Sequence, residues 1–225
     1  MTVQAARSPL PVAWIPMQNL QKTRSSMTRA VFLDRDGVIN RKPLEGEYVT
    51  CWEDFHILPG VVEGIALLKQ AGFCVLVVTN QRCIAKGLMS VADLENIHQR
   101  MSDLLKRAGA AVDGVYYCPH EQEPPCNCRK PAPGMLLEAA SSRGIDLSAS
   151  WMIGDSDIDV EAGINAGCKT ARLLTSSEAV DEPGCSRGTA PRADIAAASL
   201  LDVIGEILRG EGAVARSLAR DRATT

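Results

Sequence analysis

Aromatic residues are scarce in this sequence: Phe, Trp and Tyr together make up 4% of the 225 residues. Proteins that bind single-stranded nucleic acid stack bases on aromatic rings, so this scarcity disfavours that class of protein. A large excess of charge is also missing, because the formal net charge is only −3. Without a strongly basic character, we expect neither nucleic acid nor an anionic membrane surface as a partner.

Long apolar runs are missing as well. No stretch approaches the roughly 18 consecutive apolar residues that cross a bilayer. The first 20 residues hold a short apolar patch that Pro9, Pro11 and Pro16 interrupt, whereas a signal peptide needs an unbroken apolar segment of about 7–15 residues. We therefore expect a cytoplasmic protein with no membrane partner.

Cysteine is present in number, with eight residues. A disulfide framework is not expected in a reducing compartment. Three of the cysteines lie within a span of eleven residues, and the other five are scattered (Cys51, Cys74, Cys83, Cys168 and Cys185). This distribution predicts a metal site plus isolated thiols.

Apolar runs alternate with helical patterns along the chain. The predicted strands are 29–34, 73–80, 112–118, 150–155 and 169–174, and the predicted helices are 61–72, 90–109, 133–144, 159–167 and 199–210. Short continuous apolar runs are typical of buried parallel strands. The alternation predicts an α/β domain with a Rossmann-like, doubly wound parallel sheet.

The predicted domain spans residues 29–210. Residues 1–28 lack a clean period and hold three prolines, so they are expected to be a partly disordered N-terminal extension. Met27 is a possible alternative start of the chain, and residues 211–225 are expected to be a loose C-terminal tail.

Polar residues follow the predicted strands, and in a doubly wound sheet ligands bind at the carboxyl ends of the strands. In the stretch "DRDG", Asp34 and Asp36 come directly after the first strand, and Gly37 allows a sharp turn. Such a carboxylate pair can hold Mg²⁺. One member could also act as a nucleophile and the other as an acid or base.

Four motifs occur in order at predicted strand ends: "FLDRDGVIN", "VVTNQ", "CRKP" and "GDSDID". Together they resemble the haloacid dehalogenase superfamily of phosphatases over roughly residues 30–174. With the Cys/His cluster before "RKP", the set resembles the heptose bisphosphate phosphatase group, to which the histidinol-phosphate phosphatases are near relatives.

The resemblance implies a role for each matching residue. Asp34 would be the nucleophile and a Mg²⁺ ligand, and Asp155 would be the other carboxylate on the metal. Asp36 would be the general acid and base, with its backbone carbonyl on the metal. Thr79 and Lys130 would bind the transferring phosphoryl group, whose negative charge needs fixed donors and cations.

Substrate binding is assigned to a further set: Asn80, Gln81, Arg82, Arg129 and Ser156. A guanidinium such as that of Arg129 suits a second phosphate group. The acids that follow Ser156, at positions 157 and 159, are expected only to favour the start of a helix.

The sequence departs from the family pattern at a few positions. Arg82 and Cys83 stand where serine and glycine are typical, and Lys86 stands in place of an arginine. Ser156 replaces the lysine or arginine that is usual after the metal aspartate. These differences leave the identity of the sugar phosphate open.

The metal site predicted from cysteine follows the pattern C-x-H-x5-C-x-C, formed by Cys118, His120, Cys126 and Cys128. Three thiolates and an imidazole complete the tetrahedral shell of a structural Zn²⁺. The ion would fix the loop that carries the basic pair at 129–130. The isolated His56 and His98 are not expected to be ligands.

Too few residues lie between the motifs for a cap domain. Only 22 residues separate Asp36 from Pro59, and about 50 separate Asn80 from Lys130. We therefore expect a capless site whose specificity comes from residues 40–54, residues 80–87 and the zinc-binding loop.

These observations favour a monomeric, Mg²⁺-dependent phosphatase that acts on a small phosphorylated substrate. The resemblance implies D-glycero-D-manno-heptose 1,7-bisphosphate as the expected substrate, hydrolysed at C7 through an aspartyl-phosphate. Histidinol phosphate or another small phosphomonoester is the alternative substrate. A zinc-stabilised binding protein without catalytic activity is the alternative of a different class.

Overall fold

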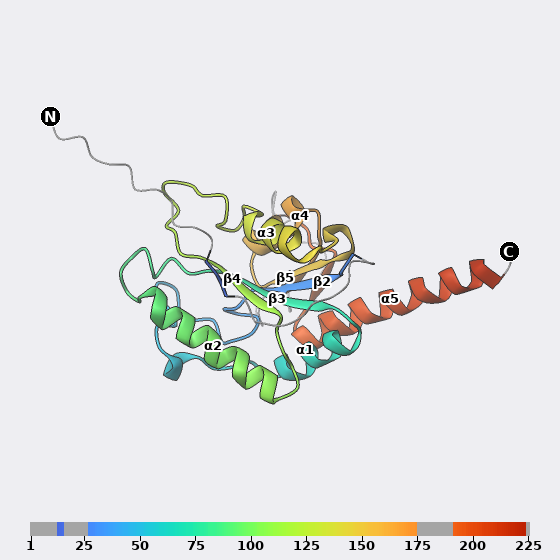
Figure 1. The fold of residues 1–225 in the computed structure, drawn as a ribbon, viewed down its shortest axis with the longest axis horizontal. Coiled ribbons are helices and arrows are strands. Elements are labelled where there is room, and N and C mark those ends of the chain that lie inside the picture. Colours follow the sequence, from blue (N-terminus) through green and yellow to red (C-terminus); the bar gives the residue numbers. More distant parts are fainter. Residues whose placement is uncertain (1–12, 16–26, 175–190, 224–225) are drawn as a thin grey trace.

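The computed structural model describes residues 13–15, 27–174 and 191–223, and side chains within 27–174 and 191–211 (Figure 1). A single seven-stranded sheet runs through this part of the chain in the order β1-β4-β3-β2-β5-β6-β7. The strands are Ala13–Ile15, Ala30–Leu33, Cys74–Asn80, Gly114–Cys118, Trp151–Gly154, Lys169–Leu173 and Ile195–Ala197. Strands β2 to β7 pair in parallel, and β1 pairs antiparallel with β4. The predicted parallel sheet is therefore confirmed.

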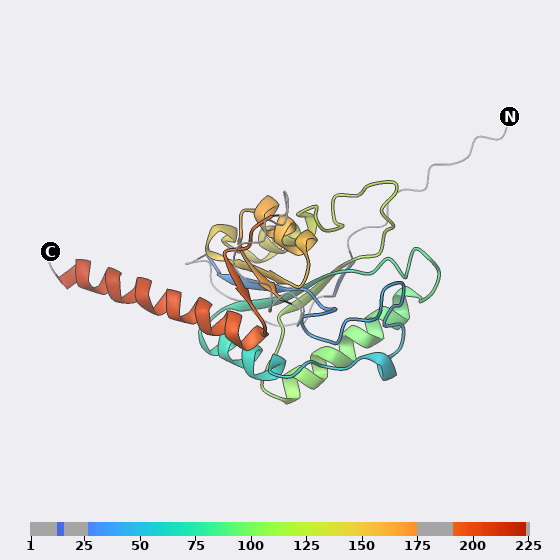
Figure 2. The same cartoon turned by 180° about the vertical axis from the view of Figure 1, so that it is seen from behind.

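In the described part of the chain, five α-helices lie on the two faces of this sheet (Figures 1 and 2). They are α1 (Val61–Gln70), α2 (Val91–Arg107), α3 (Gly134–Arg143), α4 (Asp157–Ala166) and α5 (Leu200–Ala223). Apolar side chains of α1, α2 and α5 form one core cluster with the sheet, and those of α3 and α4 form the other. Burial on both faces explains why β2 and β5 read as continuous apolar runs.

Local signals in the sequence set the helix boundaries. The Ser90 hydroxyl accepts a hydrogen bond from the Asp93 backbone N–H, and the Asp93 carboxylate accepts one from the Ser90 N–H, so α2 begins with a capping box. Gly144 and Gly167 adopt left-handed conformations directly after α3 and α4, which residues with a Cβ rarely do.

Three segments differ from the sequence-based expectation. Strands β1 and β7 were not predicted, because three residues hold too little of a repeating pattern to be recognised. Helix α5 continues to Ala223 rather than ending at Gly210. Its last part is rich in Ala, Leu and Arg, which favour helix enough to continue through the glycines at 210 and 212. It projects from the body of the domain (Figure 2).

The carboxyl ends of the strands carry loops but no second domain within the described residues. Between β2 and α1 the chain forms only the short 3-10 helix Trp52–Asp54, and between β3 and β4 the only helix is α2. The expectation of a capless core is confirmed. Among the helices described, none is both long and apolar enough to span a membrane.

Candidate active site

Strands β2, β3 and β5 are neighbours in the sheet, so the residues that follow them meet at one edge. Asp34 follows β2, Thr79 lies near the end of β3, and Asp155 follows β5. Gly37 has a φ of +95°, and a Cβ at this position would lie 2.2 Å from Asp155 Oδ2. Only glycine allows the turn after β2 to approach Asp155 so closely.

Three carboxylates converge at this edge. Asp34, Asp155 and Asp159 each offer an oxygen, and the three oxygens all lie within 4.8 Å of one another. Carboxylate oxygens are the ligands that Mg²⁺ prefers, so the donor set fits the metal implied by the sequence. The Asp36 side chain is not part of this cluster, and its carboxylate is bound by other groups.

Asp159 was predicted only as an acid that favours a helix start, and that interpretation was incomplete. Its carboxylate does take part in a capping box with Ser156, but the residue is fully buried. It lies four positions after Asp155 in the first turn of α4, next to the buried Val160. The four-residue spacing from Asp155 was the signal in the sequence that Asp159 could also belong to the carboxylate cluster. Asp157, by contrast, is half-exposed and pairs with Arg172.

Lys130 lies between two of these carboxylates and has a side chain that is 1% exposed. Its Nζ lies 2.9 Å from Asp34 Oδ1 and 2.6 Å from Asp159 Oδ1, and it donates to the Val78 carbonyl at 2.9 Å. Burial lowers the pKa of Lys130, but attraction to Asp159 and Asp34 outweighs it and raises that pKa above its ordinary value. Lys130 is therefore a fixed cation.

Asp34 is buried beside this lysine. Burial raises the pKa of Asp34 to about 7, although the charge of Lys130 opposes the change. The Arg35 backbone N–H donates to Asp34 Oδ1 at 2.7 Å. The Lys130 ammonium and the Arg35 N–H contact the same oxygen, Oδ1, and together hold the carboxylate in one orientation.

Asn80 was predicted to bind substrate, and the structure shows that its amide is engaged by the chain itself. Its Nδ2 donates to the Lys130 carbonyl at 3.1 Å, and its Oδ1 accepts from the Lys130 N–H at 3.0 Å. This paired contact connects the end of β3 to the loop that carries Lys130. Asn80 positions Lys130 rather than leaving an amide free for a ligand.

Asp36 accepts hydrogen bonds from three side chains. Both Arg35 Nε and Nη2 donate to it, at 2.9–3.2 Å, and Asn40 Nδ2 and Gln81 Nε2 donate at 2.9 Å each. Burial raises its pKa, but Arg35 and the hydrogen bonds from Asn40 and Gln81 together lower that pKa below the ordinary value. Asp36 is therefore held as an ionised acceptor.

Gln81 and Thr79 extend this hydrogen-bond network. Gln81 Nε2 lies 2.9 Å from both Asp36 Oδ2 and Thr79 Oγ1. The structure therefore brings the predicted catalytic Thr79 and the predicted substrate-binding Gln81 next to Asp36. Both residues are buried, so their main contacts are with this network.

Two site residues, Arg35 and His98, contact each other in a way that the sequence did not indicate. The Arg35 side chain is fully enclosed, and its Nη1 lies 3.2 Å from His98 Nε2. His98 comes from α2 and is not part of either potential metal cluster among the described residues. Burial, followed by the charge of Arg35, lowers the pKa of His98 well below its ordinary value, so the neutral imidazole accepts from the guanidinium.

The other predicted substrate-binding residues lie around this centre. Arg82 Nε donates to the Tyr48 hydroxyl at 2.6 Å, and Lys86 Nζ lies 5.4 Å from the centre of the same ring. Ser156 directs its hydroxyl to Asp159. Arg129 donates to the His120 carbonyl at 3.2 Å, which ties it to the second cluster.

A hollow lies beside Tyr48, on the loop between β2 and α1. It is lined by Arg41, Pro43, Glu47, Tyr48, Val49, Thr50, Asp54 and Leu88. Because Arg82 also contacts Tyr48, the region predicted to give specificity combines an open surface with basic side chains.

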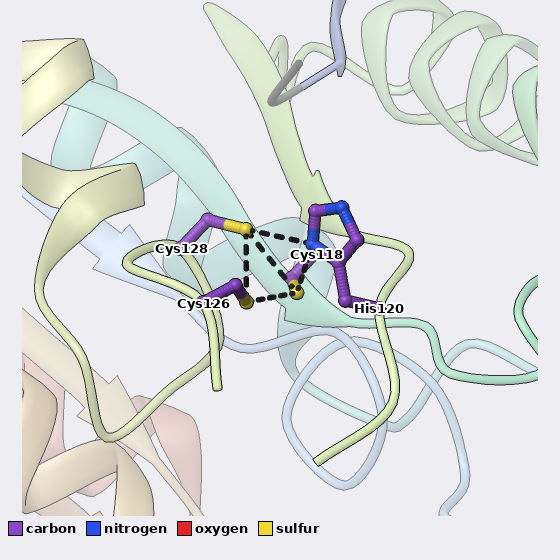
Figure 3. Close-up of side chains that lie close together, drawn as sticks. All are labelled: Cys118, His120, Cys126 and Cys128. Carbon is purple, nitrogen blue, oxygen red and sulfur yellow. Dashed lines mark hydrogen bonds between the residues drawn. The ribbon is translucent and has the colours of Figure 1, made fainter. Parts of the chain in front are cut away.

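The cysteine-rich loop brings its four predicted ligands together (Figure 3). The three sulfur atoms lie 3.3–3.6 Å apart, and His120 Nδ1 lies 3.2 Å from Cys128 Sγ and 3.5 Å from Cys118 Sγ. Tetrahedral Zn²⁺ with bonds of about 2.3 Å to sulfur places the sulfur atoms about 3.8 Å apart, so binding would need them to separate by only a few tenths of an ångström. The geometry and the soft donor set therefore fit zinc.

The sequence of this chain is similar to a family model and to named proteins. Residues 127–203 match the HAD-hydrolase-like family model. The chain is 41% identical over 150 residues to the D-glycero-beta-D-manno-heptose-1,7-bisphosphate 7-phosphatase of Helicobacter pylori J99, an alignment that covers 66% of this chain and 84% of the relative. The enzyme of the same name from Escherichia coli K12 is 39% identical over 158 residues, covering 67% and 81%.

A solved structure supports the same relationship. The D,D-heptose 1,7-bisphosphate phosphatase of B. bronchiseptica, complexed with magnesium and phosphate, superposes with a TM-score of 0.72 at 32% sequence identity. The match covers 81% of this chain and 99% of that protein. The chain belongs to the haloacid dehalogenase superfamily and, within it, to the family of the heptose bisphosphate phosphatases.

Proposed function

We propose that this protein is a Mg²⁺-dependent phosphatase that removes the 7-phosphate of D-glycero-D-manno-heptose 1,7-bisphosphate. The observation that carries the proposal is the convergence of Asp34, Asp155 and Asp159 around the buried Lys130. Relatives at about 40% identity are named for this reaction. Phosphoryl transfer needs a positioned nucleophile and fixed charge near the phosphoryl oxygens, and the chain provides both.

In the first step, a carboxylate oxygen of Asp34 forms a bond to phosphorus while the bond to the sugar oxygen breaks. The leaving oxygen takes a proton from Asp36, and an aspartyl-phosphate remains on Asp34. Lys130, and Thr79 through its hydroxyl, bind the phosphoryl oxygens. Mg²⁺, held by Asp34, Asp155 and Asp159 with the Asp36 carbonyl, would reduce the repulsion between the anionic nucleophile and the anionic substrate.

In the second step, water attacks the aspartyl-phosphate and Asp36 accepts the proton that the water loses. The environment of Asp36 suits this role, because hydrogen bonds from Arg35, Asn40 and Gln81 keep its carboxylate ionised. The step regenerates Asp34 and releases inorganic phosphate. Because the pKa of Asp36 is lowered in the free protein, the proton used in the first step is held on Asp36 only while an anionic phosphate lies beside it and raises that pKa.

The cysteine-rich loop is proposed to bind a structural Zn²⁺. All four ligand positions are filled by protein side chains, so none remains for a reacting water. Lys130 comes two residues after the ligand Cys128, and Arg129 between them donates to the carbonyl of the ligand His120. The ion would thereby hold the basic pair at the edge of the active site, where Arg129 could meet the second phosphate of the substrate.

The proposal is tested by measuring phosphate release from heptose 1,7-bisphosphate and from histidinol phosphate, each with Mg²⁺. We expect the higher kcat/KM for heptose bisphosphate and no turnover by Asp34→Asn. A higher kcat/KM for histidinol phosphate would reassign the substrate. A wild-type protein that releases no phosphate from any phosphomonoester would instead indicate a binding protein.

A further inference from the structure

Two lysines contact the carboxylate cluster, and they are held in different ways. Lys130 is enclosed and touches Asp34 and Asp159. Lys42 extends from the loop between β2 and α1, and its Nζ lies 2.6 Å from Asp155 Oδ2. The Lys42 side chain is 56% exposed, whereas that of Lys130 is 1% exposed. Lys130 is thus a fixed part of the site, and Lys42 reaches it from solvent.

The two lysines divide the negative charge of the cluster between them. Lys130 pairs with two of the carboxylates, and Lys42 pairs with the third. The Asp155 side chain is 9% exposed, and a carboxylate so far removed from water needs a cation beside it. In this arrangement the ammonium of Lys42 is that cation for Asp155.

The carboxylate that Lys42 binds belongs to the proposed metal set. Asp155 Oδ2 is also the atom that lies against Gly37 in the turn after β2, so it faces the catalytic loop. The Lys42 ammonium lies 2.6 Å from Asp155 Oδ2. A divalent cation bound to the same carboxylate would be close to this ammonium, and the two positive charges would repel each other strongly where little water separates them. The two positive charges therefore compete for the same carboxylate.

We propose that Lys42 is an exchangeable cation of the active site, which a divalent metal displaces from Asp155 and which then binds the phosphoryl oxygens of the substrate. The inference rests on the proposed function. The displacement is easy because an ion pair with one largely exposed partner contributes little. The lysine side chain is also long and flexible, so its ammonium can reach a phosphate bound at the same cluster.

A structural brace is the competing explanation, and it has the opposite consequence. If Lys42 only held Asp155 in place, its removal would disorder the carboxylate and weaken metal binding. If Lys42 competes with the metal, its removal strengthens metal binding. The sign of the change in Mg²⁺ affinity therefore separates the two roles without any measurement of catalysis.

The experiment compares Lys42→Gln and Lys42→Arg with the wild type. The matched control is Lys69→Gln, which removes a lysine that pairs with Asp113 outside the cluster. Calorimetric titration with Mg²⁺ alone gives the metal affinity, and titration of the Mg²⁺-loaded protein with inorganic phosphate gives the anion affinity. For Lys42→Gln we expect Mg²⁺ to bind about two- to fivefold more tightly and phosphate to bind more weakly. Lys42→Arg and the control should stay close to the wild type.

A Mg²⁺ affinity that falls or does not change in Lys42→Gln would overturn the competition. A phosphate affinity that does not fall would overturn the second role. Opposite changes in the two affinities support the proposal, because damage to the fold would weaken both. If these changes occur while heptose bisphosphate is not hydrolysed, the proposed function fails and the role of Lys42 stands.

Discussion

His98 Nε2 accepts a hydrogen bond from Arg35 Nη1 at 3.2 Å, and this contact connects helix α2 to the catalytic loop. Arg35 can only donate, so the imidazole must be neutral and must carry its proton on Nδ1. The same guanidinium holds Asp36 through Nε and Nη2. His98 therefore affects the orientation of the proposed acid and base without approaching a substrate.

Replacement of His98 by leucine should lower kcat about tenfold and leave KM nearly unchanged, since a hydrogen bond to a charged group is lost. Met101→Leu is the control, because Met101 is buried on the same helix. In an Asp36→Asn background, His98→Leu should have little further effect on kcat. Equal losses in both backgrounds would show that His98 acts through the fold rather than through Asp36.

The stability of the protein should depend on His98 at acidic pH. The folded-state pKa of His98 is lowered well below its ordinary value of 6.5, so below that pH the unfolded chain binds more protons than the folded one. This difference removes up to about 1.4 kcal/mol of unfolding free energy per pH unit as the pH falls. The His98→Gln variant has no imidazole to take up a proton on unfolding. In urea unfolding, the difference in unfolding free energy between the wild type and this variant should therefore shrink from pH 7 to pH 5. If the difference in unfolding free energy between the two proteins does not change with pH, His98 is not held neutral in the folded protein.

Replacement of Asp159 by asparagine should reduce the unfolding free energy by about 3 kcal/mol, because it removes one partner of a buried lysine. Asp157→Asn is the matched control on the same helix turn, since Asp157 is half-exposed in its pair with Arg172. The control should change stability by about 1 kcal/mol or less. Thermal unfolding of both variants measures the difference, and similar losses would argue against a special role for Asp159.

Gly37→Ala should abolish phosphate release and weaken Mg²⁺ binding, because its methyl group would overlap Asp155 Oδ2. Gly46→Ala separates this overlap from backbone strain. Gly46 has a φ of +86°, similar to that of Gly37, but a Cβ on Gly46 would meet nothing within 4 Å. Both variants should lose about 1–2 kcal/mol of stability through the left-handed conformation, and only Gly37→Ala should lose activity. Full activity in Gly37→Ala would refute the close approach.

Cys128→Ser should release the proposed zinc ion and lower kcat/KM by about 100-fold. The loop would then no longer hold Lys130, and a displacement of about 1 Å can have an effect of this size. The exposed Cys51 provides the control, as Cys51→Ser changes a thiol outside the cluster. Elemental analysis and phosphate-release kinetics check both variants. Zinc in the wild type near zero would exclude the structural ion and leave the phosphatase proposal untouched.

The features that the sequence predicted well depend on local patterns. The alternation of apolar runs and helical periods indicated the succession of the central strands and their helices along the chain, and the spacing from Cys118 to Cys128 indicated the four potential metal ligands. Parallel strands have their carboxyl ends at one edge, which is why Asp34 and Asp155 could be placed together in advance. In each case, neighbouring residues in the chain carried the information.

The features that the sequence did not predict depend on contacts between distant residues. Lys42 meets Asp155 across 113 positions, and Arg35 meets His98 across 63. Nothing near Asn80 showed that its amide would bind the Lys130 backbone, 50 positions away. Each such partner is fixed by the packing of a loop or helix on the sheet. No repeating pattern in the local sequence indicates that packing.

The short chain distance from Cys128 to Lys130 makes the active site vulnerable at a place where no chemistry occurs. Oxidants and thiophilic heavy metals attack sulfur, and here the attacked Cys128 sulfur lies two residues from Lys130, the proposed phosphoryl-binding ammonium. Such agents would silence the enzyme by releasing that ammonium from its position. With the proposed zinc ion bound, this phosphatase would respond to such agents as zinc proteins do, although the ion proposed for its reaction is a harder one.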